Sequence, residues 1–217
     1  MALAFIFDLD GVIVDSNPVH EQVWHRYLLS LGIPASGKLA ARMYGRRNDE
    51  IVRDLFGQDL SPEAVFFHGA AKEALYRESM KEQLQERLVP GVREFLEANK
   101  GIPKGLATNA EPANAEFILT ESGLKSYFSV VVDGHQVERP KPDPEVFLRA
   151  ASLLGVQPRD CVVFEDSLAG VQAALAAGAR VVALATTHHS LPQADLVVRD
   201  FLAPELQPWL TRQTTSL

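Results

Sequence analysis

Hydrophobic positions along the chain follow two patterns. From residue 89 onward, short Val-rich runs alternate with stretches in which apolar residues recur every three or four positions. The short runs are typical of buried strands, and the longer periodic stretches are typical of amphipathic helices. The predicted strands are the run that begins at Phe5, KGLAT (104–108), SVVVD (129–133), CVVFED (161–166), RVVALA (180–185) and ADLVV (194–198).

Helix boundaries between these strands carry their usual markers. In DPEVFLRAASLLG, Asp143 is the predicted N-cap, Pro144 lies in the first turn and Gly155 follows the end. Ser167 is the predicted cap of the helix SLAGVQAALAAG. Continuous apolar strands that alternate with helices predict a doubly wound α/β core, Rossmann-like, with a parallel sheet covered on both faces. In such sheets, ligands bind at the carboxyl ends of the strands.

Residues 16–87 contain helical patterns and no convincing strand. The pattern therefore predicts a small all-helical domain (16–87) inserted into an α/β catalytic core (1–15 and 88–217). Phe66 and Phe67 are expected in the core of the inserted domain. The first helix, NPVHEQVWHRYLLSLG, has one apolar stripe, formed by Val19, Val23, Trp24, Tyr27, Leu28 and Leu31.

Two carboxylates, Asp8 and Asp10, lie at the end of the first strand, in FDLDG. Alternate residues of a strand share a face, so both side chains are expected to project the same way. Two like charges about 4 Å apart repel by on the order of 4 kcal/mol at an effective dielectric constant near 20. The pair is therefore either solvated at a strand end or holds a cation.

Polar residues at the other strand ends favour the second reading. Thr108, Lys141 and the pair Glu165–Asp166 are expected at the same edge of the sheet. Several carboxylates in one site suit a hard cation, and magnesium combines a few protein oxygens with water and phosphate. An aspartate can attack phosphorus, and a lysine supplies the positive charge that phosphoryl transfer requires. Taken singly, Lys141 would be a surface lysine in a turn.

Four segments resemble, in order, the motifs of the haloacid dehalogenase superfamily, most closely its β-phosphoglucomutase-like phosphatases: FDLDGVIVDS, LATNA, RPKPDPEVF and VFEDSLAG. The resemblance covers nearly the whole chain. It implies Asp8 as nucleophile and magnesium ligand, and Asp10 as general acid and base that also contributes its backbone carbonyl to the metal. Asp166 would bind the metal with support from Glu165. The phosphate-binding residues would be Thr108, Asn109 and Lys141, and the inserted helices would form a cap.

Residues of the inserted domain indicate a function less specifically than the four motifs do. His20 matches a histidine of β-phosphoglucomutase, although a lone histidine at a helix start is often structural. Lys72 matches a cap lysine by spacing. Arg46 and Arg47 lie where the family places its specificity loop, and they either clamp a second anion or form a solvated face.

Together, these residues predict a magnesium-dependent phosphatase. It is expected to act on a small phosphorylated metabolite, such as a sugar phosphate, through an aspartyl-phosphate intermediate. One alternative is β-phosphoglucomutase, which His20 favours. Against it, Tyr44 and Asn48 stand where the mutase has lysine and arginine. The other is a non-catalytic phosphometabolite-binding protein, which the intact set of motif residues disfavours.

The composition of the chain limits the classes of partner that it is expected to bind. With 21 basic and 28 acidic residues the formal net charge is −7, which argues against nucleic acid or an anionic membrane as partner. No apolar run approaches the length of a membrane span. The single cysteine, Cys161, lies in an apolar run and is read as an inert buried thiol. We expect a cytoplasmic enzyme that is a monomer or weak homodimer.

Overall fold

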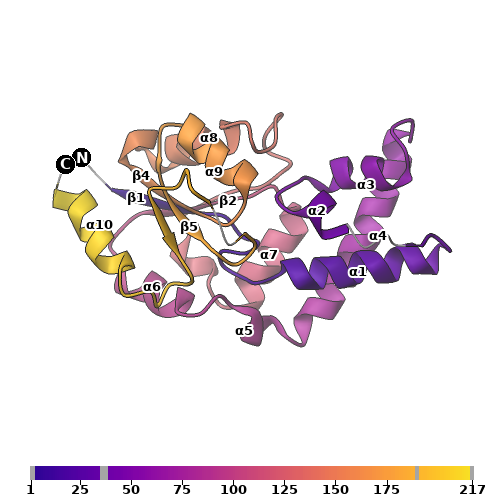
Figure 1. Cartoon of the computed structure of the whole chain (residues 1–217), viewed down its shortest axis with the longest axis horizontal. Coiled ribbons are helices and arrows are strands. Elements are labelled where there is room, and N and C mark those ends of the chain that lie inside the picture. Colours follow the sequence, from indigo (N-terminus) through magenta and orange to yellow (C-terminus); the bar gives the residue numbers. More distant parts are fainter. Residues whose placement is uncertain (1–2, 35–38, 189–190, 216–217) are drawn as a thin grey trace.

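The computed structural model describes residues 3–34, 39–188 and 191–215. Within them, six parallel strands form one sheet in the order β3-β2-β1-β4-β5-β6 (Figure 1). This confirms the predicted α/β fold with a doubly wound parallel sheet. The strands are β1 (Ala4–Phe7), β2 (Lys104–Ala107), β3 (Val130–Val132), β4 (Cys161–Glu165), β5 (Arg180–Leu184) and β6 (Leu196–Val198).

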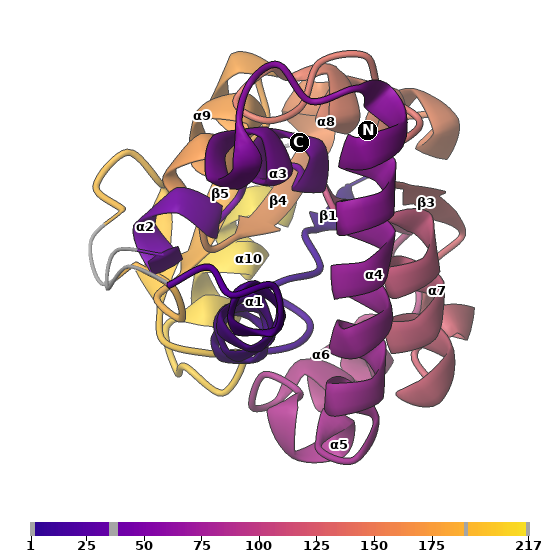
Figure 2. The same ribbon diagram turned by 90° about the vertical axis from the view of Figure 1, so that its right-hand side faces the viewer.

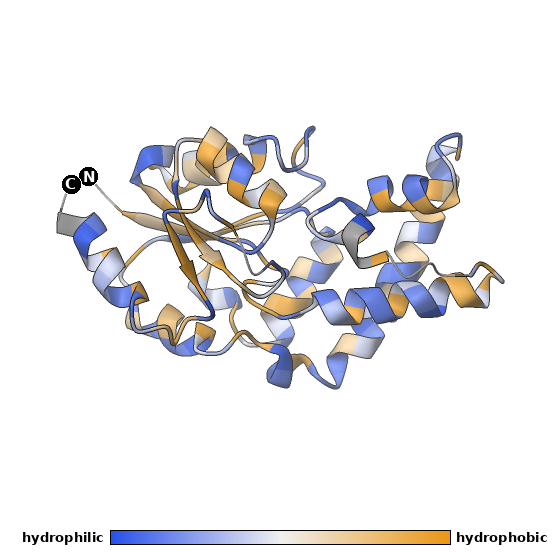
Figure 3. Ribbon diagram, viewed as in Figure 1, coloured by the Kyte–Doolittle hydropathy of each residue, from blue (hydrophilic) through white to orange (hydrophobic). Residues whose placement is uncertain are grey.

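Helices cover both faces of the sheet, and the side chains of β1 show why. Phe5 and Phe7 join one apolar cluster and Ala4 and Ile6 another, as the twofold alternation of a strand requires. The first cluster includes residues of α6 (Val92–Ala98), α7 (Pro112–Glu121) and α10 (Leu206–Thr215). The second includes residues of α8 (Glu145–Leu154) and α9 (Leu168–Ala176). Burial on both faces makes the strands almost continuously hydrophobic (Figure 3).

Phenylalanine packing aligns the central strands where the polar residues begin. The rings of Phe7 and Phe164 stack with centroids 4.6 Å apart, and the two residues are paired in the ladder between β1 and β4. The next backbone bond, from the Asp8 N–H to the Phe164 carbonyl, is 3.0 Å long. Asp8 and Glu165 consequently leave the sheet side by side.

The residues predicted to cap α8 and α9 lie at or within one residue of the predicted cap positions. Ser167 Oγ accepts a hydrogen bond from the Gly170 N–H at 3.0 Å and caps α9, as predicted. At α8 the helix begins one residue later than expected, with Pro144 at the N-cap position. Asp143 Oδ1 still accepts a bond from the Glu145 N–H at 3.0 Å, so its side chain supports the first turn. Two 3₁₀ turns, Lys125–Tyr127 and Pro158–Asp160, precede β3 and β4.

The described residues between 17 and 87 form a helical lobe beyond the carboxyl end of the sheet, on the right in Figure 1. Its helices α1 (Asn17–Ser30) and α4 (Pro62–Lys81) alternate polar and apolar positions (Figure 3). A separate apolar cluster around Trp24, Leu28 and Val52 holds the lobe together, and α4 also packs against α7 of the core (Figure 2). The helices are α1 (Asn17–Ser30), α2 (Leu39–Met43), α3 (Asn48–Phe56), α4 (Pro62–Lys81) and α5 (Leu84–Arg87).

Three predicted core positions of this lobe are wrong. Leu31 is 45% exposed because α1 ends at Ser30, so the apolar stripe stops one turn short. Phe66 and Phe67 are 73% and 65% exposed, since α4 turns Val65 and Gly69 inward instead.

Two connecting segments join the lobe to the core, and they run next to each other. Val14 and Leu88 form an antiparallel bridge, and the Asp15 N–H donates to the Arg87 carbonyl at 2.7 Å. Asp15 and Arg87 are also ion-paired at 3.4 Å. Among the described residues, no helix has both the length and the apolar character needed to cross a membrane.

Candidate active site

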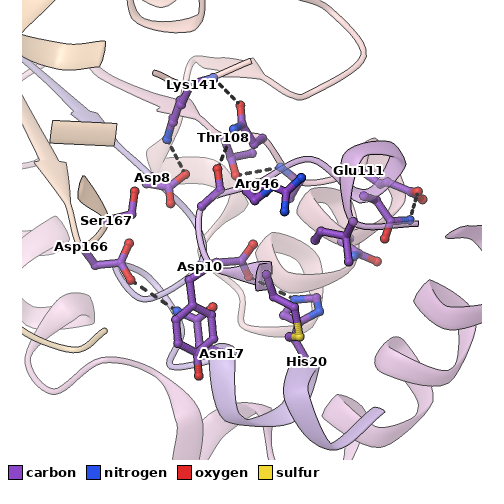
Figure 4. Close-up of a pocket in the computed structure, with 18 of the residues that line it drawn as sticks. Asp8, Asp10, Asn17, His20, Arg46, Thr108, Glu111, Lys141, Asp166 and Ser167 are labelled. Atoms are coloured by element: carbon purple, nitrogen blue, oxygen red, sulfur yellow. Dashed lines mark hydrogen bonds and ion pairs between the residues drawn. The ribbon is translucent and has the colours of Figure 1, made fainter. Parts of the chain in front are cut away.

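A cavity of about 70 Å³ lies where the carboxyl end of the sheet meets the helical lobe (Figure 4). The carboxyl ends of β1, β2 and β4 supply its floor, because the ladder residues Phe7, Leu106 and Phe164 are paired and the chain leaves each strand just beyond them. Helices α1 and α4 and the segment between α2 and α3 supply its roof. The cavity collects most of the predicted site residues: Asp8, Asp10, His20, Arg46, Lys72, Thr108, Asn109, Lys141, Glu165 and Asp166.

Lys141 is the buried cation next to Asp8. Its Nζ donates to Asp8 Oδ1 at 2.9 Å, to Glu165 Oε1 at 2.6 Å and to the Ala107 carbonyl at 3.1 Å. Only 2% of its side chain is exposed. Burial works to lower the pKa of Lys141, but the two carboxylates outweigh it and hold that pKa above its ordinary value. Lys141 is therefore a fixed positive charge beside Asp8.

Three carboxylates lie close together at the same point, and their combined negative charge exceeds the positive charge of Lys141. Asp8, Glu165 and Asp166 each place an oxygen within 4.8 Å of the others. Burial, aided by the charges of Glu165 and Asp10, raises the pKa of Asp8 to about 7 although Lys141 opposes it. Burial and the neighbouring carboxylates raise the pKa of Asp166 well above its usual range. A divalent cation would relieve this repulsion, so the donor set fits a hard cation.

Hydrogen bonds decide which oxygens remain available to a cation. Glu165 Oε1 accepts from Lys141, and its Oε2 accepts from the Asp166 N–H at 2.8 Å, the Ser167 N–H at 2.9 Å and Ser167 Oγ at 3.0 Å. Asp8 Oδ2 and Asp166 Oδ1 have no hydrogen-bond partner within the described part of the chain. Glu165 therefore orients the loop and Lys141, whereas Asp8 and Asp166 have free lone pairs.

Asp10 is held separately, against helix α1. Its Oδ1 accepts from Ser16 Oγ at 2.5 Å and lies 3.5 Å from His20 Nε2. Burial opposes ionisation of Asp10, but the contacts with His20 and Ser16 lower its pKa below the ordinary value. The two aspartates of the first motif thus have different electrostatic environments: the pKa of Asp8 is raised and that of Asp10 is lowered.

His20 connects Asp10 to a buried lysine. Lys72 Nζ lies 2.6 Å from His20 Nδ1 and 2.8 Å from Glu73 Oε1. An ammonium only donates hydrogen bonds, so Nδ1 accepts and Nε2 carries the proton that faces Asp10. The His20 ring also stacks on Tyr76 with centroids 3.8 Å apart. Packing and hydrogen bonds therefore fix both the position and the tautomer of His20.

The second motif links the floor of the cavity to the lobe. Thr108 is buried, and its Oγ1 accepts from the Ala110 N–H at 3.1 Å. Asn109 Nδ2 donates to the Gly45 carbonyl at 2.9 Å, while its Oδ1 accepts from the Lys141 N–H at 3.3 Å. Asn109 thus contacts both the lobe and the segment that carries Lys141.

The two adjacent arginines lie at the edge of the cavity and face acidic side chains. Arg46 is paired with Asp54 at 3.3 Å, and Asp54 also pairs with Arg42 at 2.8 Å. Arg47 is paired with Asp49 at 3.2 Å and lines a neighbouring cavity of about 260 Å³. Both guanidinium groups already have a carboxylate partner in this arrangement.

Two further residues contact Asp166 and were not singled out from the sequence. Asn17 Nδ2 donates to Asp166 Oδ2 at 3.3 Å and to Thr187 Oγ1 at 2.6 Å, and Thr187 Oγ1 itself donates to Asp166 Oδ2. Thr187 lies three residues after the end of β5, near the same edge of the sheet, a position that could have marked it. The adjacent His188 is half-buried, and His189 lies outside the described residues.

Comparison with known proteins agrees with this geometry. The family model described as haloacid dehalogenase-like hydrolase matches residues 3–178. The chain belongs to this family, as the motifs predicted. Within the family it is a phosphoric monoester hydrolase of the β-phosphoglucomutase-like kind.

Individual relatives cover four-fifths of the chain or more. Fructose-1-phosphate phosphatase YqaB of Escherichia coli K12 is 35% identical over 178 residues, which are 80% of this chain and 91% of that protein. A phosphorylated carbohydrates phosphatase of Thermotoga maritima is 37% identical over 183 residues, 81% of each chain. The crystal structure of β-phosphoglucomutase from Clostridium difficile superimposes with a TM-score of 0.87 at 28% identity, covering 100% of this chain and 98% of the other.

Proposed function

We propose that the protein is a magnesium-dependent phosphatase that hydrolyses the monophosphate ester of a small sugar through an aspartyl-phosphate on Asp8. The observation that carries the proposal is the position of the Asp8 carboxylate. One oxygen is bound by Lys141 and the other is unbonded within the described residues, at the floor of a cavity that the lobe covers. The activities for which two relatives are named, a fructose-1-phosphate phosphatase and a phosphorylated carbohydrates phosphatase, support the substrate class.

In the first step, Asp8 Oδ2 attacks phosphorus while the bond from phosphorus to the ester oxygen breaks. The leaving alkoxide takes a proton from the Asp10 carboxyl group. Asp10 must be protonated at this stage, and a bound anionic phosphoryl group beside it favours the neutral form. Lys141 balances the charge that accumulates on the phosphoryl oxygens. The step yields the free sugar and phosphorylated Asp8.

In the second step, water attacks phosphorus and the bond between phosphorus and Asp8 breaks. The attacking water gives its proton to the Asp10 carboxylate, and inorganic phosphate leaves. The ionised form of Asp10 is the one that Ser16 and His20 stabilise, so these two residues prepare Asp10 as the base of this step. The proton gained here serves the next turnover.

Asp166 would hold the magnesium ion through its free Oδ1, and Asp8 through Oδ1, the oxygen that does not attack phosphorus, with Glu165 in support. The backbone carbonyl of Asp10 is a further ligand that we propose from the motif. When bound, the ion supplies positive charge at the phosphoryl oxygens and neutralises the two carboxylates.

We further propose that residues 16–87 act as a cap on the core formed by 1–15 and 88–217. The contact between Asn109 and the Gly45 carbonyl closes the cavity from the lobe side. A closed cavity excludes bulk water and strengthens the electrostatic contacts within it. Thr108 and Asn109 from the core, with His20 and Lys72 from the lobe, complete the proposed phosphate and substrate contacts.

Phosphate release from a panel of sugar monophosphates tests the proposal. Wild-type protein with magnesium should release phosphate from fructose 1-phosphate or a related ester. Asp8→Asn should abolish release without changing the circular dichroism spectrum, because the shape is kept and the nucleophile is lost. Asp59→Asn, at an exposed position of the lobe, is the matched control and should retain full activity. Unchanged turnover by Asp8→Asn would overturn the proposal.

A further inference from the structure

The contact between Asn17 and Asp166 joins the lobe to the cation-binding carboxylate. Asn17 is the first residue of α1, and Asp166 follows β4 in the core, 149 positions later in the chain. Figure 4 shows the two side chains next to each other, joined by a dashed line. The contact therefore crosses the boundary between the lobe and the core next to the reacting carboxylate.

Three hydrogen bonds form a closed triangle around one oxygen. Asn17 Nδ2 donates to Asp166 Oδ2 and to Thr187 Oγ1, and Thr187 Oγ1 donates to Asp166 Oδ2. Two of them end on Oδ2 and the third joins the two donors, so the rotation of the carboxylate is fixed. Oδ1 is then the oxygen that remains free, and Asp166 belongs to the group of carboxylates that includes Asp8 and Glu165.

Neighbouring contacts fix both donors. Pro18 follows Asn17 in the first turn of α1, where its ring restricts the backbone. Thr186, next to Thr187, donates from Oγ1 to the Gly11 carbonyl at 2.6 Å and so attaches the β5 loop to the loop that carries Asp10. Gly11 is itself required at this point, since a Cβ there would lie 1.9 Å from Asp166 Oδ2.

We propose that Asn17 and Thr187 are positioning residues that orient Asp166 for magnesium, and that Asn17 makes cation affinity depend on the position of the lobe. The proposal rests on the proposed function for the identity of the cation. Partners that orient a ligating carboxylate contribute about 10- to 100-fold to metal affinity. Asn17 is part of α1 and moves with the lobe. Its contribution to magnesium affinity is therefore available only when the lobe lies over the core as in this structure. By reciprocity, magnesium then favours that position.

Titration calorimetry of the purified full chain with magnesium chloride tests the positioning role without turnover. Asn17→Ala and Thr187→Val should each raise the Kd for magnesium about 10-fold or more. Asn99→Ala is the matched control, because Asn99 donates only to the Phe95 carbonyl on α6, outside the cavity, and should leave the Kd unchanged. Wild-type Kd in both Asn17→Ala and Thr187→Val would overturn the proposal.

Small-angle X-ray scattering tests the role of the lobe. Magnesium should reduce the radius of gyration of the wild type, and this response should be lost in Asn17→Ala and retained in Thr187→Val at saturating magnesium. Equal responses in wild type and Asn17→Ala would refute the coupling. At saturating magnesium the substrate KM of Asn17→Ala should match that of the wild type, which separates a defect of cation binding from a general defect of the site. If no variant, including wild type, releases phosphate while the Kd values change as expected, the proposed reaction fails and the positioning role stands.

Discussion

Lys141 donates a hydrogen bond of 2.9 Å to Asp8, a residue 133 positions away in the sequence. The parallel sheet makes this contact possible because β1 and β4 end together, and the segment after β3 brings the lysine over them. The same ammonium bonds Glu165, so one cation stabilises two buried carboxylates. Removing it leaves both charges without their partner.

Lys141→Met should therefore destabilise the fold as well as stop turnover. Breaking a buried pair costs about 3 to 5 kcal/mol in free energy of unfolding. Urea denaturation in the presence of a chelator measures this loss of stability without compensation from bound metal. Lys125→Met removes an exposed pair with Glu116 and should cost less than about 1 kcal/mol. Equal stability of the two variants would contradict the account of Lys141.

The contribution of Asp8 to stability in chelator should fall as the pH rises from about 4 to 7. The pKa of Asp8 is raised from 3.8 to about 7 in the folded protein, mainly by burial, so the native state binds the proton more tightly than the unfolded state. This contribution is present below pH 3.8 and is lost as the pH rises through 7. Other carboxylates, such as Glu73, have a lowered pKa and act in the opposite direction, so the measurement is the difference in free energy of unfolding between the wild type and Asp8→Asn. A difference that rises over this interval would show that Asp8 is ionised in the native state.

His20→Ala should slow hydrolysis of sugar phosphates by roughly 10-fold, part of the 10²- to 10⁴-fold that a positioned acid or base contributes. The loss should be of similar size for 4-nitrophenyl phosphate, because both substrates form the same phosphorylated Asp8, whose hydrolysis uses Asp10 as base. His25→Ala, on the same helix with a half-exposed side chain, should match the wild type on both substrates. A loss confined to sugar phosphates would contradict the role of His20 in preparing the base.

Hydrolysis should outpace any mutase reaction. A mutase must bind a second phosphate from the lobe, but Arg46 and Arg47 already face Asp54 and Asp49. With β-glucose 1-phosphate and a trace of the 1,6-bisphosphate, free phosphate should appear faster than glucose 6-phosphate. If glucose 6-phosphate appears faster by about 100-fold, roughly 2.7 kcal/mol in barrier height, the mutase alternative is correct.

Sequence patterns were sufficient to predict those features of the fold that a single local rule determines. The alternation of Phe5 and Phe7 against Ala4 and Ile6 indicates a strand buried on both faces, and Ser167 before an apolar helix indicates its cap. The strand ends then locate the carboxylates of the site. These features depend on a few neighbouring residues and on the properties of parallel sheets.

The remaining features depend on how the lobe meets the core. The sequence gives no sign that Asn17 reaches Asp166, because the contact requires the angle between α1 and the sheet. The exposure of Phe66 and Phe67 likewise depends on which face of α4 meets its neighbours, and that helix is apolar on more than one side. Tertiary packing sets these positions, and local periodicity does not report it.

Trapping the phosphorylated enzyme tests the central claim most directly. In Asp10→Asn, an aryl phosphate can still phosphorylate Asp8 because its leaving group needs no acid, whereas hydrolysis lacks its base. The account predicts a burst of one nitrophenol per enzyme, and after acid quenching, mass spectrometry should find a phosphoryl group on Asp8. A phosphoryl group on another residue, or steady release of phosphate with no burst and no modified Asp8, would contradict it.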